Sequence, residues 1–277
     1  PFVIRDFRLY IAVWLDVDRY IDVTERLKDL REVFQNNLQN VGIITNKVYP
    51  SAFLSFQDEI LNPKKSKTHI EEINWDRLNN LNIQMVDNES YFDIKKNRIE
   101  LQDDLAVSSF SVRSYPELWP AWEMKNLLGS ENNDFLRISC PFAQIFTFYV
   151  LSGEGSATRA MIKSTRSTQQ ASSKMRLFTP GIEEKARDWK FVLDHTQKGK
   201  RLLEAQYRIL LFADQKKLAK EEETLKGLFK TLGWIISRDD MQHLPCFLSS
   251  LPFWLNEERW KEIKLMNKAR TILSWTA

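Results

Sequence analysis

The chain has 277 residues, of which 43% are hydrophobic and 12% aromatic, enough apolar material for one large domain or two smaller lobes. Its 40 basic and 37 acidic residues leave a net charge of +3. This balance favours neither nucleic acid nor a membrane surface, because those partners usually require a field of one sign. Only 8 Gly and 9 Pro argue against a repeat array or a long disordered tract.

Two cysteines, Cys140 and Cys246, stand among apolar residues. We expect buried thiols in a reducing compartment, with a single disulfide as the alternative. No transmembrane segment or signal peptide is predicted, since the longest uncharged stretch, residues 138–153, is short and contains Pro141, Gln144 and other polar residues. The termini lack natural start and stop signatures, so we expect a piece of a longer protein.

A strand, a helix and a second strand are predicted at the start of the chain. Every second residue of the first strand is apolar: Phe7, Leu9, Ile11, Val13 and Leu15. Apolar residues then recur in steps of three and four between residues 23 and 41, which predicts a helix. Gly42 is placed to end that helix in the left-handed conformation, and residues 42–45 begin the second strand.

The same pattern returns near the other end of the chain. Apolar residues alternate over 203–213, with Glu204, Gln206 and Arg208 on the opposite face. A helix and Gly233 follow, and then another strand over 234–237. The sequence therefore predicts two related strand–helix–strand units.

Strands and helices also lie between these units. Residues 90–114 predict a β-meander, and the apolar run 139–151 predicts a strand suited to the interior of a sheet. A polar helix is expected over 156–176, where Ala157, Met161, Ala171 and Met175 form only a thin apolar stripe, and a second helix is expected from Glu183.

These elements together indicate an α+β fold with mixed or antiparallel sheets and long flanking helices. We expect a first lobe at 1–138, a second lobe at 139–243 and a connecting segment at 244–277.

No catalytic or cofactor-binding motif is found. A P-loop requires Gly-x-x-x-x-Gly-Lys-Ser/Thr, but Gly199-Lys200 is followed by Arg201 and Asp194 stands at the required first glycine. Asp16 and Asp214 each follow an apolar run, as a magnesium-binding acid does, yet we interpret them as helix caps.

Phosphate and metal sites are equally poorly supported. The Gly-Glu-Gly at 153–155 lacks the third glycine of a dinucleotide-binding loop. His243 and Cys246 have a ligand-like spacing, but two ligands do not complete a tetrahedral site. We therefore expect no catalytic, cofactor-binding or metal-binding residue in the chain.

Two surfaces are candidates for contact. The helix over 156–176 carries the basic residues Arg159, Lys163 and Arg166, which suit phosphate groups, a protein partner or plain solvent. The segment 244–255 is rich in large apolar residues and is broken by two prolines. We expect most of it to pack on the domain and Phe253 or Trp254 to remain partly exposed for contact with a partner.

Several segments, in order along the chain, resemble the N-terminal domain of the F-type TraC family of conjugative type IV secretion ATPases. They are Phe7–Ile11, Tyr91–Leu101, Leu136–Phe142 (LRISCPF), Ala171–Phe178, Glu183–Trp189 and Phe247–Phe253 (FLSSLPF). The resemblance implies a non-catalytic assembly and docking domain whose ATP- and Mg-binding motor lies beyond residue 277.

The resemblance also implies partners and a location. The parent ATPase is expected to be hexameric and cytoplasmic, bound peripherally at the bacterial inner membrane. Its partners would be its own motor, neighbouring subunits and inner-membrane proteins of the secretion channel. A module of the same machine that contacts DNA or a substrate protein is the alternative.

Overall fold

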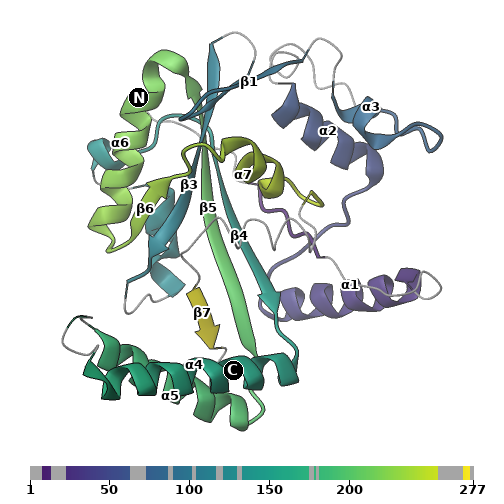
Figure 1. The fold of residues 1–277 in the computed structure, drawn as a ribbon. Helices are drawn as coiled ribbons and strands as arrows, with labels where there is room; N and C mark the ends of the chain where they lie inside the picture. The colour runs from purple at the N-terminus through teal and green to yellow at the C-terminus, as the bar shows by residue number, and fades with distance from the viewer. Residues whose placement is uncertain are drawn as a thin grey trace.

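The computed structural model describes residues 8–13, 23–62, 73–86, 90–101, 104–116, 121–129, 133–174, 178, 181–254 and 271–274. In this part of the chain, helices surround one sheet whose strand pairs are all antiparallel (Figure 1). The predicted α+β class is confirmed. None of the helices in these residues is both long and apolar enough to cross a membrane.

The sheet is built around one long strand. Its main path is β1 (Phe92–Ile94), β2 (Ile99–Leu101), β3 (Leu105–Ser114), β5 (Leu202–Asp214) and β4 (Phe142–Val150). Two further strands extend it, β6 (Ile235–Arg238) beside β3 and β7 (Thr271–Ser274) beside β5. The predicted meander is confirmed as β1–β3. Because β3 and β4 share β5 as a partner, a single sheet combines strands from both predicted lobes.

The strand predicted over 139–151 is present as β4, but its predicted interior position is wrong. It lies at the edge of the sheet, with β5 on one side and no strand on the other among the described residues. A run of apolar residues does not distinguish the two positions, since an edge strand that packs against a core is equally apolar.

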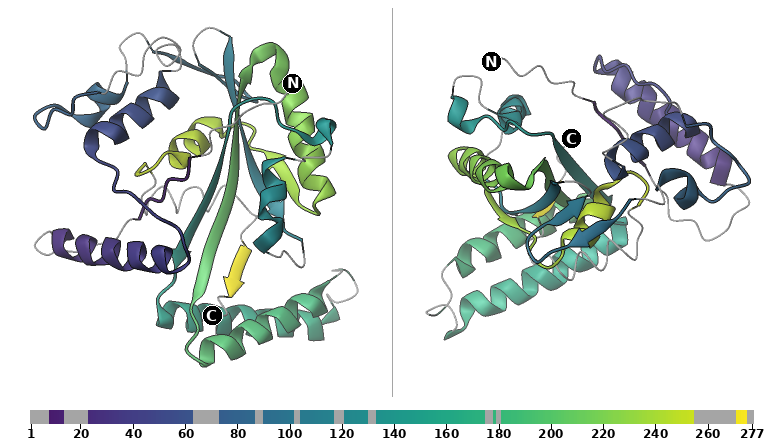
Figure 2. Two further views of the ribbon diagram at one scale, coloured as in Figure 1. Left: turned by 180° about the vertical axis from the view of Figure 1, so that it is seen from behind. Right: turned by 90° about the horizontal axis from the view of Figure 1, so that it is seen from above.

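The helices cover both faces and one end of the sheet. They are α1 (Val23–Asn40), α2 (Pro50–Leu61), α3 (Leu81–Met85), α4 (Gly153–Ser172), α5 (Ile182–Gln197), α6 (Gln215–Thr231) and α7 (His243–Ser250), with the 3₁₀ helices η3 (Ala121–Leu128) and η4 (Asp134–Leu136). In Figures 1 and 2, α4 and α5 lie side by side across the lower end of β4 and β5.

Two hydrophobic cores lie on opposite faces of β5. On one face, Tyr207, Ile209 and Leu211 pack with apolar residues of α6 such as Phe229. On the other, Leu210 packs with residues of α2 and α7, among them Phe247. Because both faces of β5 are buried, this one strand supplies side chains to each of the two cores.

The second predicted strand–helix–strand unit is confirmed as β5, α6 and β6. Its turn requires Gly233, whose φ of +79° lies in the left-handed region. The first predicted unit is only partly present: α1 forms and Gly42 has φ +84°, as expected, but residues 8–13 and 42–45 are not strands. Phe7 and Leu15 lie outside the described residues.

The missing strands have a physical reason in the packing of this region. No residue of α1 is buried, so the helix offers no core on which a flanking strand could pack. Residues 8–13 instead contact α2, where the rings of Tyr10 and Phe56 are 4.1 Å apart and Arg8 pairs with Glu59. Alternation of apolar residues predicts a strand only where a pairing edge is available.

Candidate functional site

The segment from α7 to Trp254 is held firmly on the sheet. Pro245 lies in the first turn of α7, where the missing N–H is tolerated, and Pro252 follows its end. Phe247 and Leu251 are buried, and Leu244, Leu248 and Trp254 are partly buried against the same core. The expectation that most of this segment packs on the domain is therefore confirmed, with Leu255 outside the described residues.

Of the two residues expected to remain partly exposed, Phe253 and Trp254, Phe253 is the exposed one and Trp254 is partly buried. Phe253 is 67% exposed, and its φ of +66° is unusual for a residue with a side chain. Its ring meets that of Phe53 in α2 edge to face, with 5.4 Å between centroids. The backbone therefore turns sharply after α7 and presents one aromatic ring at the surface.

A buried cation fixes α7 to the sheet. Arg208 in β5 is 3% exposed, and its Nη1 donates to the carbonyl oxygen of Cys246 at 2.9 Å and to Oγ of Ser249 at 2.6 Å. Its Nε lies 3.9 Å from Oδ2 of Asp239, which is also buried. A buried charge of this kind requires such partners, because removing it from water is costly.

Asp239 continues this network into β3. Its Oδ2 accepts hydrogen bonds from Oγ of Ser109 at 2.7 Å and of Ser111 at 2.9 Å. The backbone N–H of Ser109 donates to Nδ1 of His243 at 3.3 Å. We call Arg208, Asp239, Ser109, Ser111 and His243 the buried polar cluster; it joins β3, β5 and the start of α7.

Burial favours the neutral form of two titratable groups in and beside this cluster. Burial lowers the pKa of His243 below its usual value, and burial raises the pKa of the Cys246 thiol to about 12. A protonated thiol is a poor nucleophile and a poor metal ligand. Among the described residues, no group of three His, Cys, Asp or Glu side chains is arranged to hold a metal ion. Both cysteines are free thiols.

Helix α4 packs through small residues, and the stripe predicted for it is only partly present, since Ala157 and Ala171 are half-buried. Its buried residues are Ser156, Ala160, Ser164 and Ser167, whereas Met161 is exposed and Met175 lies outside the described residues. Small side chains let α5 approach closely. At its start, α4 is tied to the sheet, since Leu202 N–H donates to Oγ of Ser156 at 3.1 Å.

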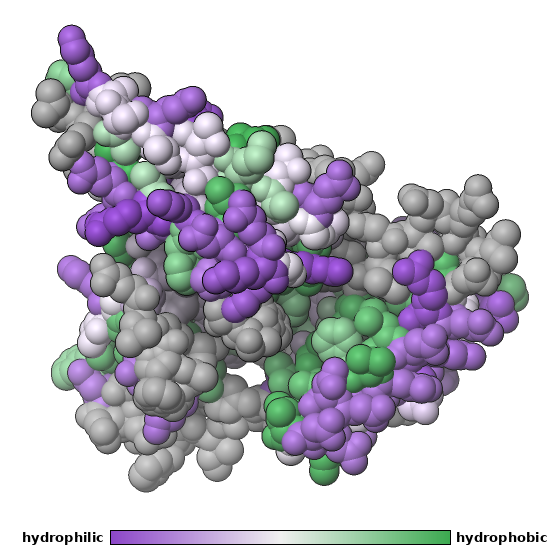
Figure 3. All heavy atoms as spheres, turned by 90° about the horizontal axis from the view of Figure 1, so that it is seen from below, coloured by the Kyte–Doolittle hydropathy of each residue, from purple (hydrophilic) through white to green (hydrophobic). Residues whose placement is uncertain are grey.

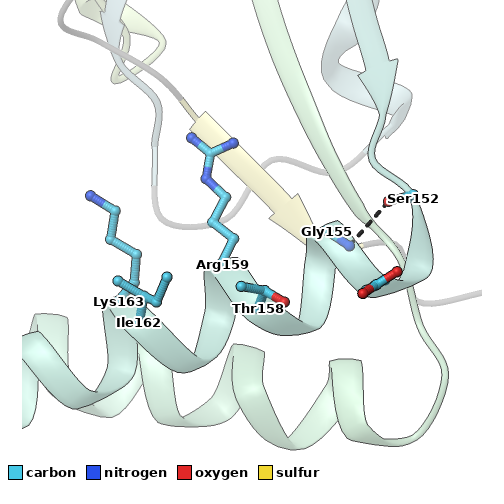
Figure 4. Close-up of a pocket in the computed structure, with 7 residues that line it drawn as sticks. Ser152, Gly155, Thr158, Arg159, Ile162 and Lys163 are labelled. Atoms are coloured by element: carbon cyan, nitrogen blue, oxygen red, sulfur yellow. Dashed lines mark hydrogen bonds between the residues drawn. The ribbon is translucent and has the colours of Figure 1, made fainter.

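The three basic residues of α4 have different roles. Arg159 forms an ion pair with Glu204 of β5, which is buried, so this cation is committed to the fold. Lys163 and Arg166 are exposed. Arg159 and Lys163 project from the same side of α4, beside a shallow hollow of about 440 Å³ at the start of the helix (Figure 4). Glu154 also lines this hollow, which makes it a poor cradle for phosphate.

The remaining sequence candidates take ordinary positions. Asp214 ends β5, is exposed, and pairs with Lys217 at 3.2 Å one turn into α6. Gly199 and Lys200 lie in the turn between α5 and β5. Asp16 lies outside the described residues.

Sequence reasoning missed the role of Arg208. It was expected on the polar face of its strand with Glu204 and Gln206, and it does lie on that face. The face is buried, however, because α7 covers it. A signal was present: Leu210 and Phe212 continue the same face as apolar residues, which indicates a strand covered on both sides.

The comparison with known proteins identifies one relationship. A family model described as TraC protein matches residues 1–255, most of the chain. No curated protein matches the chain. The matched range ends immediately after the α7 segment.

Proposed function

The chain belongs to the TraC family and is a component of a conjugative type IV secretion system, and from this premise we propose that it is the non-catalytic assembly and docking domain of the family's ATPase. The nucleotide-binding motor, with its ATP and Mg, would lie in another part of the parent protein. This division of labour agrees with the absence from the sequence of the Gly-x-x-x-x-Gly-Lys-Ser/Thr motif.

The observation that carries the proposal is the presentation of Phe253. The preceding helix is anchored through Arg208 and the buried polar cluster, so the position of the exposed ring is fixed relative to the sheet. An aromatic side chain on a rigid support loses little conformational entropy on binding, and such residues are enriched among interface hot spots. We assign Phe253, with Trp254 beside it, to contact with the motor or a neighbouring subunit.

The proposed location follows from the same premise. The parent ATPase would be a hexamer on the cytoplasmic side of the inner membrane, docked on membrane proteins of the secretion channel. The exposed Lys163 and Arg166 of α4 would then face an acidic protein surface or lipid head groups.

Substitution in the complete ATPase tests the assembly role. We expect Phe253→Ala to lower the recovery of the assembled ATPase on size-exclusion chromatography, while the amount and the thermal stability of the subunit stay unchanged. Phe135→Ala is the matched control, because Phe135 is 88% exposed and lies on a different part of the chain. Equal assembly by both variants and the wild type would contradict the assignment of Phe253.

The alternative function, contact with DNA or a transported protein, would rely on the basic residues of α4. It is less well supported, because Arg159 is already paired with Glu204 and the helix has no aromatic side chain for stacking on bases. Binding of single- or double-stranded DNA by the purified chain that weakens with salt and with Lys163→Ala would favour this alternative.

A further inference from the structure

The outer edge of β4 has the properties of a pairing surface. Its nine residues, FAQIFTFYV, include no charge, no proline and no glycine. In the described part of the chain, no strand pairs with this edge. Natural proteins usually protect such edges with charges, prolines or bulges, because an unprotected edge is a template for another strand.

The hydrogen bonds to β5 show which backbone groups point outward. Phe212 N–H donates to the carbonyl oxygen of Pro141 at 2.9 Å, and Leu151 N–H donates to that of Leu202 at 3.0 Å. Because antiparallel pairs alternate between hydrogen-bonded and non-hydrogen-bonded, the odd-numbered residues of β4 turn their backbone groups toward β5. Gln144, Phe146 and Phe148 therefore turn their N–H and C=O groups outward.

Two of these outward-bonding residues, Phe146 and Phe148, also have exposed side chains, whereas Gln144 donates from Nε2 to the carbonyl oxygen of Leu127. Phe146, Phe148 and Val150 lie on one face of the strand and are 52%, 42% and 46% exposed. The view from below shows a group of hydrophobic residues exposed beside hydrophilic ones (Figure 3). An apolar face beside an open backbone edge offers both parts of strand addition, main-chain hydrogen bonds and side-chain burial.

We propose that this edge pairs antiparallel with the β4 of a second copy of the chain, which joins two sheets into one. Full overlap of the nine-residue strand places Phe146 opposite Phe146 of the other copy. Pairing of the strand with itself brings no charge against a like charge within the strand. The nearest flanking charges have opposite sign, Arg137 before the strand and Glu154 after it. Antiparallel pairing brings Arg137 of each copy toward Glu154 of the other copy.

Sedimentation of the 277-residue chain tests the pairing. We expect a dimer, and we expect Phe146→Lys to weaken it at least about tenfold, since like charges directly opposite in a sheet are destabilising. Phe135→Lys, which changes a still more exposed aromatic residue elsewhere, should leave the dimer unchanged. A wild-type chain that stays monomeric, or a Phe146→Lys variant that dimerises as tightly as wild type, would overturn the proposal.

A cross-link tests the register independently of folding effects. Opposite residues of a hydrogen-bonded antiparallel pair have Cα atoms about 5.5 Å apart, within the range that a disulfide spans. In a background carrying Cys140→Ala, Phe146→Cys should therefore form a covalent dimer on mild oxidation, whereas Phe135→Cys should not. Equal cross-linking of both variants, or none by Phe146→Cys, would refute this register.

This inference rests on the proposed assembly role, because the pairing of β4 would be one of the contacts in the assembly. The two can fail separately. Phe146→Lys should disrupt the dimer of the 277-residue chain without Phe253 being changed, and Phe253→Ala should leave that dimer intact while it impairs assembly of the complete ATPase. Loss of the dimer in the Phe253→Ala variant would show that the interface includes the α7 segment and would count against β4 pairing.

Discussion

Arg208 in the middle of β5 donates from Nη1 to the carbonyl oxygen of Cys246 in α7, across 2.9 Å. This bond lies at the centre of the buried polar cluster, where Asp239 balances the charge of the guanidinium. The surface that presents Phe253 thus depends on a buried cation that anchors the preceding helix α7. Stability and docking are coupled through this residue.

Replacement of Arg208 tests that coupling. We expect Arg208→Met to lower the free energy of unfolding by about 3–5 kcal/mol, because Asp239 would remain buried without its cation. Urea denaturation followed by circular dichroism measures the change. Arg201→Ala, at an exposed position just before β5, is the control and should change stability by about 0.5 kcal/mol or less. A similar small change for Arg208→Met would mean that the cluster contributes little.

The ion pair between Arg159 and Glu204 leads to a second prediction. Arg159→Ala removes the charged partner of a carboxylate that is 2% exposed, so we expect a loss of about 1–3 kcal/mol. Lys163→Ala, one turn later on the same helix and exposed, should be close to neutral. Thermal unfolding of both variants shows whether Arg159 stabilises the fold or only adds positive charge to the surface. Equal effects would argue against the ion pair.

The stability of the chain should fall in mild acid because of His243. Burial lowers its pKa in the folded chain, so the unfolded chain binds the proton first as the pH drops. Its contribution to stability is complete above the unfolded pKa of about 6.5 and declines as the pH falls below that value. The charged groups that face it are Asp239, Asp240, Glu222 and Arg238.

His243→Asn measures this contribution, since the amide oxygen can still accept the bond from Ser109 N–H. We expect the free energy of unfolding of the variant to change less between about pH 7 and pH 5 than that of the wild type. Urea titrations at several pH values give both slopes. Parallel curves would show that other groups cause the loss of stability in acid.

Hydrogen exchange should distinguish the two ends of α4. The first turns are tied to β5 through Ser156 and Arg159, whereas the second half is held by α5 through small side chains that bury little area. We therefore expect amides of residues 165–172 to exchange faster than those of 156–162, and both faster than the core of β5. Uniform protection at the level of β5 would make α4 an ordinary core helix.

ATP turnover provides the simplest test of the non-catalytic role. The 277-residue chain should not hydrolyse ATP, because its sequence has no Gly-x-x-x-x-Gly-Lys-Ser/Thr motif and Asp214 is exposed and pairs with Lys217. A coupled assay with Mg and purified chain measures this. Hydrolysis that follows the chain through purification and disappears with Asp214→Ala would disprove the proposal.

Local sequence patterns are enough to predict most of the helices and strands of this protein. Periodicity predicted the meander, α4, α5, α6 and β5, and glycines at positions 42 and 233 predicted two helix ends, because these features depend on residues close in the chain. Proline placement and the excess of apolar side chains likewise predicted that the α7 segment packs on the domain and exposes Phe253 or Trp254, of which Phe253 is the exposed one.

Which edges and faces are covered depends on the tertiary packing. The alternating residues 8–13 lack a pairing edge, β4 lies at the margin of the sheet, and Arg208 is enclosed by a helix more than thirty residues later in the sequence. Each outcome depends on a partner from elsewhere in the chain, and a strand's own sequence carries little information about its neighbours. The same physical reason makes the open edge of β4 visible only in the folded molecule.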